Sequence, residues 1–197
     1  MGTRDVRLIL ASRSPRRREL LAAAGYEFEV WPPSEAAERG VCSGEGPTEL
    51  VARLAYQKAA DVAGRIAGRI ERGLILACDT VAECNGQILG KPDDREHARA
   101  MLMTLSGREH RVLSGLCLWR VPEGEPAVEV AVTRLRMDEL TPQQLDEYLA
   151  GDQWAGKAGA FGYQDGLDWV HVVEGSESNV VGLPMELLGE MLARYGR

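Results

Sequence analysis

Apolar positions along the chain follow two different periods, which predicts that strands and helices interleave. Short apolar runs over residues 6–11 and 74–82 are typical of buried strands. Residues 47–70 instead repeat apolar side chains three and four positions apart, which is the pattern of an amphipathic helix. The same reasoning predicts further helices over residues 15–24, 93–105, 141–148 and 183–195, and further strands over residues 26–31, 111–119, 129–137 and 169–173.

Turn and cap residues separate these elements. Ser14 followed by Pro15 is typical of a helix start, and Asn85-Gly86 is a strong signal for a hairpin turn. Residues 34–46 are predicted to form a loop, and a glycine-rich stretch covers residues 151–166. The chain has no internal repeat and no low-complexity linker. We therefore expect one α/β domain over residues 1–197, with a mixed sheet flanked by helices.

Composition and charge narrow the class of protein. Hydrophobic residues make up 45% of the 197 residues and charged residues 27%, values that are typical of a globular domain. The net charge is −7, which argues against broad nucleic-acid binding, because such binding depends on neutralising many phosphates. A phosphate ligand would therefore need a local cluster of basic residues.

The cysteines and the apolar segments indicate a cytoplasmic protein. Cys42, Cys78, Cys84 and Cys117 form no C-x-x-C pair and have no histidine at ligand spacing, so we expect reduced thiols rather than zinc ligands or disulfides. The apolar stretch at residues 8–11 is too short for a signal peptide. No later stretch reaches the roughly 20 apolar residues of a membrane-spanning helix, so no membrane association is expected.

The first candidate site is the turn between the first strand and the first helix. It contains Ser12, Arg13 and Arg16, and the helix start there offers free N–H groups to an anion. Arginine binds phosphate through two parallel hydrogen bonds, so this turn is a candidate phosphate site. The alternative is that the arginines at positions 16–18 form a solvated helix face.

Two lysines and an aspartate form the second candidate site. Lys58 falls on the apolar line of its predicted helix, where it either reaches out to solvent or meets a negative group. Asp79, followed by Thr80, ends the apolar run at 74–78, a position from which a carboxylate could bind a divalent metal or act as a general base. A turn-forming role for Asp79 is the alternative. Lys91 follows the predicted hairpin and could bring another cation to the same place.

The glycine-rich stretch is the third candidate. Its small residues allow a ligand to approach the backbone, Lys157 adds charge, and the amide of Gln164 could read a base edge. By itself, such a stretch is more often a plain loop. The common P-loop, dinucleotide-binding, serine-hydrolase and zinc-protease motifs are missing from the sequence. Together with Glu35, the candidate residues suit a polyphosphate and a metal ion, but they leave open whether a bond is cleaved or a group transferred.

Six ordered motifs give the chain a family resemblance. They read L-I-L-A-S-R-S-P-R-R-R-E-L-L at 8–21, C-D-T-V at 78–81, I-L-G-K-P at 88–92, L-S-G-R at 105–108 with His110, K-A-G-A-F-G-Y-Q at 157–164, and N-V-V-G-L-P at 179–184. Over essentially its whole length, the chain resembles the Maf family of nucleotide pyrophosphatases. This resemblance implies an elongated, two-lobed fold around a central cleft, related to inosine triphosphate pyrophosphatases.

The resemblance also implies a reaction and a set of roles. Nucleoside triphosphates would be hydrolysed between the α and β phosphates with a divalent cation, Mg²⁺ or Mn²⁺. Asp79 would be the general base and, with Glu35, a metal partner. Positions linked to substrate choice would be Arg13, Thr80 and Gln164, and the lysines that contact phosphate would be Lys58, Lys91 and Lys157.

Within the family, the position of Gln164 after Gly162 resembles the sequence of the branch that acts on dTTP and UTP. Modified pyrimidine nucleotides are further substrates compatible with this resemblance. Gly156 and Phe161 depart from the usual residues there, as does Gln153-Trp154, and these changes could alter the pocket. The alternatives are the 7-methyl-GTP branch, a transferase, and a non-catalytic nucleotide-binding regulator of cell division. A homodimer is also compatible with the resemblance.

Overall fold

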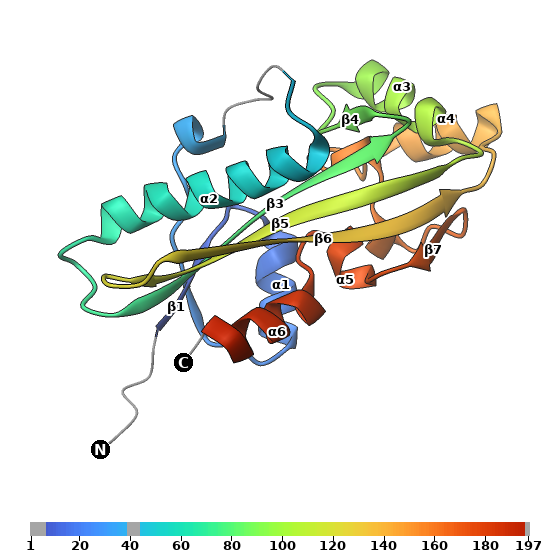
Figure 1. Cartoon of the computed structure of the whole chain (residues 1–197). Coiled ribbons are helices and arrows are strands. Elements are labelled where there is room, and N and C mark those ends of the chain that lie inside the picture. The colour runs from blue at the N-terminus through green and yellow to red at the C-terminus, as the bar shows by residue number, and fades with distance from the viewer. Residues whose placement is uncertain (1–6, 39–43, 196–197) are drawn as a thin grey trace.

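A mixed seven-stranded sheet forms the centre of the elongated molecule (Figure 1). The computed structural model describes residues 7–38 and 44–195. The strand order is β2-β1-β3-β5-β6-β7, and β4 pairs separately with β3. The strands are β1 (Arg7–Ala11), β2 (Phe28–Val30), β3 (Gly73–Cys84), β4 (Gln87–Leu89), β5 (Glu109–Val121), β6 (Pro126–Met137) and β7 (Val170–Glu174).

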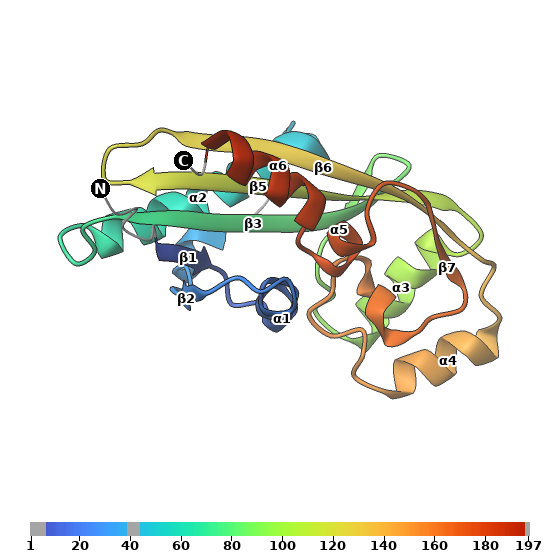
Figure 2. The ribbon, with the colours of Figure 1, turned by 90° about the horizontal axis from the view of Figure 1, so that it is seen from below.

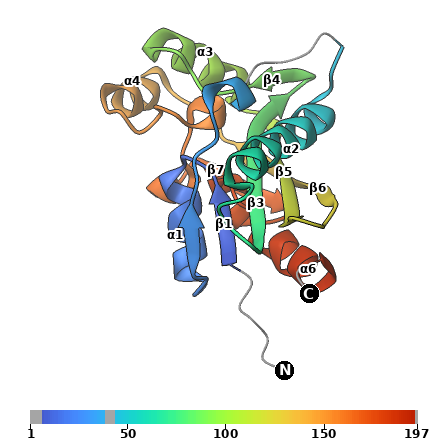
Figure 3. The same ribbon diagram turned by 90° about the vertical axis from the view of Figure 1, so that its left-hand side faces the viewer.

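Helices cover both faces of this sheet. Figure 2 shows α6 lying over β5 and β6, with α2 behind the sheet. In Figure 3, β1 and α6 lie at the bottom of the molecule, and α3 and α4 lie together at the top. The helices are α1 (Pro15–Ala23), α2 (Pro47–Ile66), α3 (Arg95–Leu105), α4 (Pro142–Ala150), α5 (Glu177–Val181) and α6 (Met185–Tyr195), with short 3-10 helices η1 (Glu35–Glu38), η2 (Ala158–Ala160) and η3 (Tyr163–Asp165).

The hydrophobic core follows the alternation of side chains along β3. Ile75 and Ala77 pack against α2, whereas Leu74, Leu76 and Cys78 pack in the cluster that includes α1 and α6. Successive residues of a strand point to opposite faces, so each face of β3 has its own apolar layer. A third cluster lies around α3 and α4 at the other end of the sheet.

Strand β3 changes partners along one edge, and this change opens a gap. Its first half pairs in parallel with β1 over Gly73 to Ala77, and its last residues pair antiparallel with β4 from Ala82 to Cys84. On the other edge, pairing with β5 is continuous from Gly73 to Glu83. The four residues between Ala77 and Ala82 therefore have no strand from β1 or β4 beside them.

Most of the predicted elements are confirmed. The α/β class, the mixed sheet, the hairpin at Asn85-Gly86 and the antiparallel pairing of β5 with β6 are all present. Cys78, Cys84 and Cys117 are unpaired and buried, whereas Cys42 lies outside the described residues. Within the described ranges, no helix is long and apolar enough to cross a membrane.

Four local predictions were wrong. The alternative of a turn-forming role for Asp79 is wrong, because Asp79 lies inside β3, which pairs with β5 through Glu83. The helix after Pro47 ends at Ile66, before Gly68, which adopts a positive φ. The predicted loop at 34–46 contains η1, and the helix α5, capped by the Ser176 side chain, precedes the predicted last helix.

Candidate functional site

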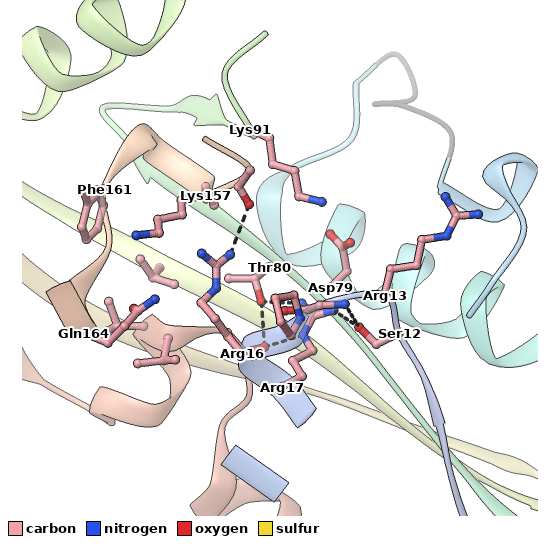
Figure 4. Close-up of a pocket in the computed structure, with 18 of the residues that line it drawn as sticks. Ser12, Arg13, Arg16, Arg17, Asp79, Thr80, Lys91, Lys157, Phe161 and Gln164 are labelled. Carbon is pink, nitrogen blue, oxygen red and sulfur yellow. Dashed lines mark hydrogen bonds between the residues drawn. The ribbon is translucent and has the colours of Figure 1, made fainter. Parts of the chain in front are cut away.

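A cavity of about 330 Å³ opens at the gap in the β3 edge (Figure 4). The loop after β1, the start of α1, the loop after β4 and the glycine-rich stretch contribute to its wall. Its lining residues are Ser12, Arg13, Ser14, Pro15, Arg16, Arg17, Glu38, Lys58, Asp79, Thr80, Lys91, Val112, Gly156, Lys157, Ala158, Phe161, Gln164, Val180, Val181 and Gly182. The structure thus brings together every predicted site residue except Glu35.

The charge of this cavity is opposite to that of the whole chain. Its wall carries two carboxylates, Glu38 and Asp79, but six cationic side chains, which are Arg13, Arg16, Arg17, Lys58, Lys91 and Lys157. The chain as a whole has a net charge of −7. A concave, cation-rich wall concentrates the field on an anion, so the cavity suits a ligand with several negative charges.

Asp79 and Lys58 form an ion pair on the α2 face of β3. Asp79 continues the row of Ile75 and Ala77, so its side chain points toward α2. Lys58 Nζ donates to Asp79 Oδ1 at 2.5 Å, and only 8% of the lysine side chain is exposed. Lys58 therefore meets a negative group and does not reach out to solvent, which decides between the two predicted alternatives.

Gly115 allows α2 to lie close enough for this pair to form. It lies opposite Asp79 in the β3–β5 register. A Cβ at Gly115 would lie 2.1 Å from the Val51 carbonyl oxygen and 2.8 Å from the Ala52 nitrogen, both on the α2 backbone. The missing side chain therefore sets the distance between β5 and α2, and with it the approach of Lys58 to Asp79.

Glu38 is the second carboxylate on this side of the cavity, and it was not among the predicted site residues. Its Oε1 lies 3.9 Å from Lys58 Nζ, whereas Glu35, at the start of η1, does not line the cavity. Among residues 7–38 and 44–195, no group of three or more His, Cys, Asp or Glu side chains could hold a metal. Mg²⁺ needs only one or two carboxylates when substrate phosphates and water complete its shell, so Asp79 and Glu38 are the carboxylates of the described cavity wall that could hold such an ion.

Arg17 organises the opposite face of β3. Its Nε donates to Gly182 O at 2.7 Å and its Nη1 to Cys78 O at 2.7 Å and Ser12 Oγ at 3.2 Å. Its Nη2 donates to Thr80 Oγ1 at 3.1 Å. The guanidinium thus joins α1, the free edge of β3 and the turn after α5 (Figure 4).

Arg17 was not among the predicted site residues, although the sequence carries a signal for it. Arg17 and Leu21 are the buried residues of α1 and lie four positions apart, on one helix face. Thr80 also exchanges a hydrogen bond with Ser114 Oγ at 2.8 Å, and Ser114 is fully buried. Every acceptor of Arg17 is a neutral oxygen, so its positive charge is not cancelled by these four bonds.

The two predicted arginines of the turn point in different directions. Arg13 Nη2 donates to Pro33 O at 2.9 Å, and Figure 4 shows its side chain directed away from Lys157 and Gln164. Arg16 extends into the cavity, where its Nη2 donates to Gly156 O at 3.2 Å. Burial, and then the neighbouring charge of Arg17, lowers the pKa of Arg16. A bound anion would relieve that unfavourable environment.

Lys91 faces the same space from the loop after β4. Desolvation, and then the charge of Lys58, lowers the pKa of Lys91. The loop is fixed from the other side, because Gly159 N donates to Gly90 O at 3.0 Å. Lys91 and Lys58 are thus held close to each other despite their like charges, which an anion between them would stabilise.

The other end of the cavity is less polar. Phe161 and Gln164 lie there in Figure 4, and the lining residues Val112 and Val180 pack in the same apolar cluster as Phe161. Figure 4 shows Lys157 directed toward Phe161, on the far side of Arg16 from Asp79. An apolar wall with one amide side chain suits a flat heterocycle, whereas the opposite end suits phosphate and metal.

The chain is similar to several known proteins over almost its whole length. The family described as Maf-like protein matches residues 7–195. A dTTP/UTP pyrophosphatase of Rhodopirellula baltica is 59% identical over 95% of this chain and 82% of that protein. A dTTP/UTP pyrophosphatase of Anaeromyxobacter sp. (strain Fw109-5) is 44% identical over 96% of this chain and 90% of that protein. A solved structure of a nucleoside-triphosphatase, dITP/XTP pyrophosphatase, from Mycobacterium abscessus is 17% identical, with a TM-score of 0.42, covering 96% of this chain and 94% of that one.

Proposed function

The chain belongs to the Maf-like protein family, and we propose that it hydrolyses dTTP and UTP to the nucleoside monophosphate and pyrophosphate. The observation that carries this proposal is the Lys58–Asp79 ion pair in the wall of a cation-lined cavity. It places a carboxylate that can accept a proton beside the groups that would hold a polyphosphate.

The two ends of the cavity give the substrate a direction. The triphosphate would lie toward Lys58 and Lys91, where its negative charge offsets their mutual repulsion. The base would lie against Phe161, with the Gln164 amide able to donate to one edge atom and accept from another. Arg16, between these ends in Figure 4, would bind the phosphate nearest the nucleoside.

Asp79 supplies the chemistry of the proposed hydrolysis. Lys58 binds Oδ1, so Oδ2 would accept the proton of the attacking water. The water oxygen forms a bond to phosphorus as the bond between the α and β phosphates breaks, and pyrophosphate leaves. Lys58 and Lys91 would stabilise the negative charge that develops on the phosphate oxygens.

We extend the proposal to a divalent cation, Mg²⁺ or Mn²⁺, shared between protein and triphosphate. Asp79 and Glu38 would hold it, because both carboxylates lie beside Lys58 on the cavity wall. When bound, such an ion neutralises phosphate charge and polarises the bond to be broken. The earlier prediction that Glu35 takes part is tested by comparing Glu38→Gln with Glu35→Gln in a metal titration.

A pyrophosphate-release assay over a panel of nucleoside triphosphates tests the proposal. Wild type should hydrolyse dTTP and UTP in preference to 7-methyl-GTP. Asp79→Asn should lower kcat about 10²–10⁴-fold, because the loss of a general base has that size of effect. Asp93→Asn is the matched control, since the Asp93 side chain is 89% exposed and lies outside the cavity wall. A wild type that binds nucleotides but cleaves none of them would replace this function with that of a nucleotide-binding regulator.

A further inference from the structure

Lys157 is held by a neighbour that does not line the cavity. Its Nζ donates to Oδ2 of Asp165, the last residue of η3, and the two side chains are 11% and 21% exposed. The reaction proposed above gives Asp165 no role. The cavity wall includes Lys157 and Gln164 but not Asp165, so this carboxylate lies behind the lysine.

The backbone between the two charges is shaped to let them meet. A Cβ at Gly162 would lie 2.2 Å from Lys157 Nζ and 2.2 Å from Asp165 Oδ2, so the ion pair crosses directly over this glycine. Asp165 N also donates to Gly162 O at 3.0 Å, which fixes the turn that presents the carboxylate. Any side chain at position 162 would separate the pair.

The same carboxylate faces a second cation from another element. Arg16, on α1, donates to Gly156 O, the residue before Lys157. The charge of Asp165 raises the pKa of Arg16 against the stronger effects of burial and Arg17. Tyr148 lies in the same surroundings, because burial and then the Asp165 charge raise the pKa of its hydroxyl. Asp165 is thus placed to orient the cations at this end of the cavity.

We infer that Asp165 is a positioning residue, whose carboxylate holds the Lys157 ammonium at the nucleoside end of the cavity. Lys157 then serves the base or sugar, and the triphosphate is left to Lys58, Lys91 and Arg16. This inference rests on the proposed function, and it changes the expected role of Lys157 as a phosphate contact. The assignment of Lys157 to the nucleoside end follows from its direction in Figure 4, where its side chain points toward Phe161.

The test compares two ligands that share the triphosphate but differ in the nucleoside. Binding of dTTP and of inorganic tripolyphosphate is measured by calorimetry, without divalent metal, for wild type and Asp165→Asn. The variant should bind dTTP about tenfold more weakly, the size expected when one charge-assisted hydrogen bond loses its geometry. Tripolyphosphate should bind equally well or more tightly, because a negative charge has been removed.

Two further variants separate positioning from other effects. Asp165→Glu, which keeps the charge, should recover part of the dTTP affinity, and Asp165→Asn should have no added effect in a Lys157→Met background. Asp168→Asn is the control, as an exposed aspartate three residues away. Thermal unfolding of each variant shows whether the loop remains folded.

The remaining outcomes overturn the inference. If both ligands bind more tightly to Asp165→Asn, the Asp165 carboxylate acts only through its negative charge and does not position Lys157. If both bind more weakly and the melting temperature falls, the ion pair only stabilises the loop. If neither changes, Lys157 does not depend on Asp165. A wild type that binds dTTP without releasing pyrophosphate would refute the proposed function and leave this inference standing, whereas one that does not bind dTTP would refute both.

Discussion

The two faces of β3 present different groups to the cavity. On the Asp79 side, which comprises Asp79, Lys58, Glu38 and Lys91, cations lie close to each other and to two carboxylates. On the Arg17 side, which comprises Arg17, Ser12, Thr80, Ser114 and Gly182, one guanidinium donates to four neutral oxygens. Adjacent residues of one strand, Asp79 and Thr80, thus belong to unlike surroundings.

This difference indicates that the Asp79 side serves the reaction and the Arg17 side stabilises the fold. On the Asp79 side, the like charges of Lys58 and Lys91 disfavour the empty cavity, and a bound polyphosphate would relieve that cost. On the Arg17 side, hydrogen bonds tie four segments that are distant in sequence, which stabilises the folded chain. Substitutions on the Asp79 side should therefore affect turnover first, and those on the Arg17 side should affect stability first.

Of three substitutions that test this difference between the two sides, Lys91→Met should have the largest effect. Losing one cation that stabilises developing phosphate charge should lower kcat/KM for dTTP about 10²–10³-fold. Desolvation and Lys58 both disfavour the charged form of Lys91, so the free energy of unfolding should stay equal or rise. Pyrophosphate release and urea unfolding measure the two effects, with Arg18→Met, at an exposed position of α1 outside the cavity wall, as the control. A variant that loses stability together with activity would remove the distinction between the two sides.

An intermediate effect, on stability, is expected for Arg17→Met. The substitution leaves buried carbonyl and hydroxyl oxygens without their charged donor, which should lower the free energy of unfolding by about 3 kcal/mol. Urea unfolding measures it, and Arg18→Met, at the exposed next position, should be near neutral. If stability is unchanged while kcat falls as for Lys91→Met, Arg17 acts on substrate and not as support.

The smallest effect is expected for Gly115→Ala. Its methyl group would push α2 away from β5, costing about 2 kcal/mol of stability by overpacking. Because Lys58 moves with α2, kcat should also fall, by about tenfold or more. Gly64→Ala, on the same helix with nothing within 4 Å of the added Cβ, should instead be slightly stabilising. Equal behaviour of the two variants would show that Gly115 does not set the position of Lys58.

The fold could be predicted where one local pattern decides the structure. The strand at β1, the helix α2 up to its last turns and the hairpin at Asn85-Gly86 follow from periodicity and turn residues. The strand predicted over residues 74–82 agrees with β3, but its pairing could not be predicted in full. Pairing of Asp79 with Gly115 and of Glu83 with Arg111 joins distant parts of the chain, which no local pattern reveals.

The sequence predicted which residues form the site better than it predicted where their side chains point. Lys58 was found because a lysine interrupts an apolar helical line, and that anomaly has the physical cause now observed, its ion pair with Asp79. Glu38 was missed because nothing in its local sequence separates it from Glu35. Which of Arg13, Arg16 and Arg17 points inward depends on how α1 packs against the sheet, and consecutive arginines look alike in a sequence.

The continuity of the long strands also constrains how the protein moves. Hinge closure requires a few residues that can change φ and ψ between two rigid bodies. Here β3 and β5 stay paired without interruption from Gly73–Val121 to Glu83–Arg111, past the cavity, and β6 continues the same sheet. A hinge between the two ends of the molecule would have to bend all three paired strands, so this continuity disfavours hinge closure there. Among the described parts of the chain, we expect entry of substrate and release of product to depend on the surface segments around Lys91 and around residues 156–164, whose opening rates would limit turnover if chemistry is fast.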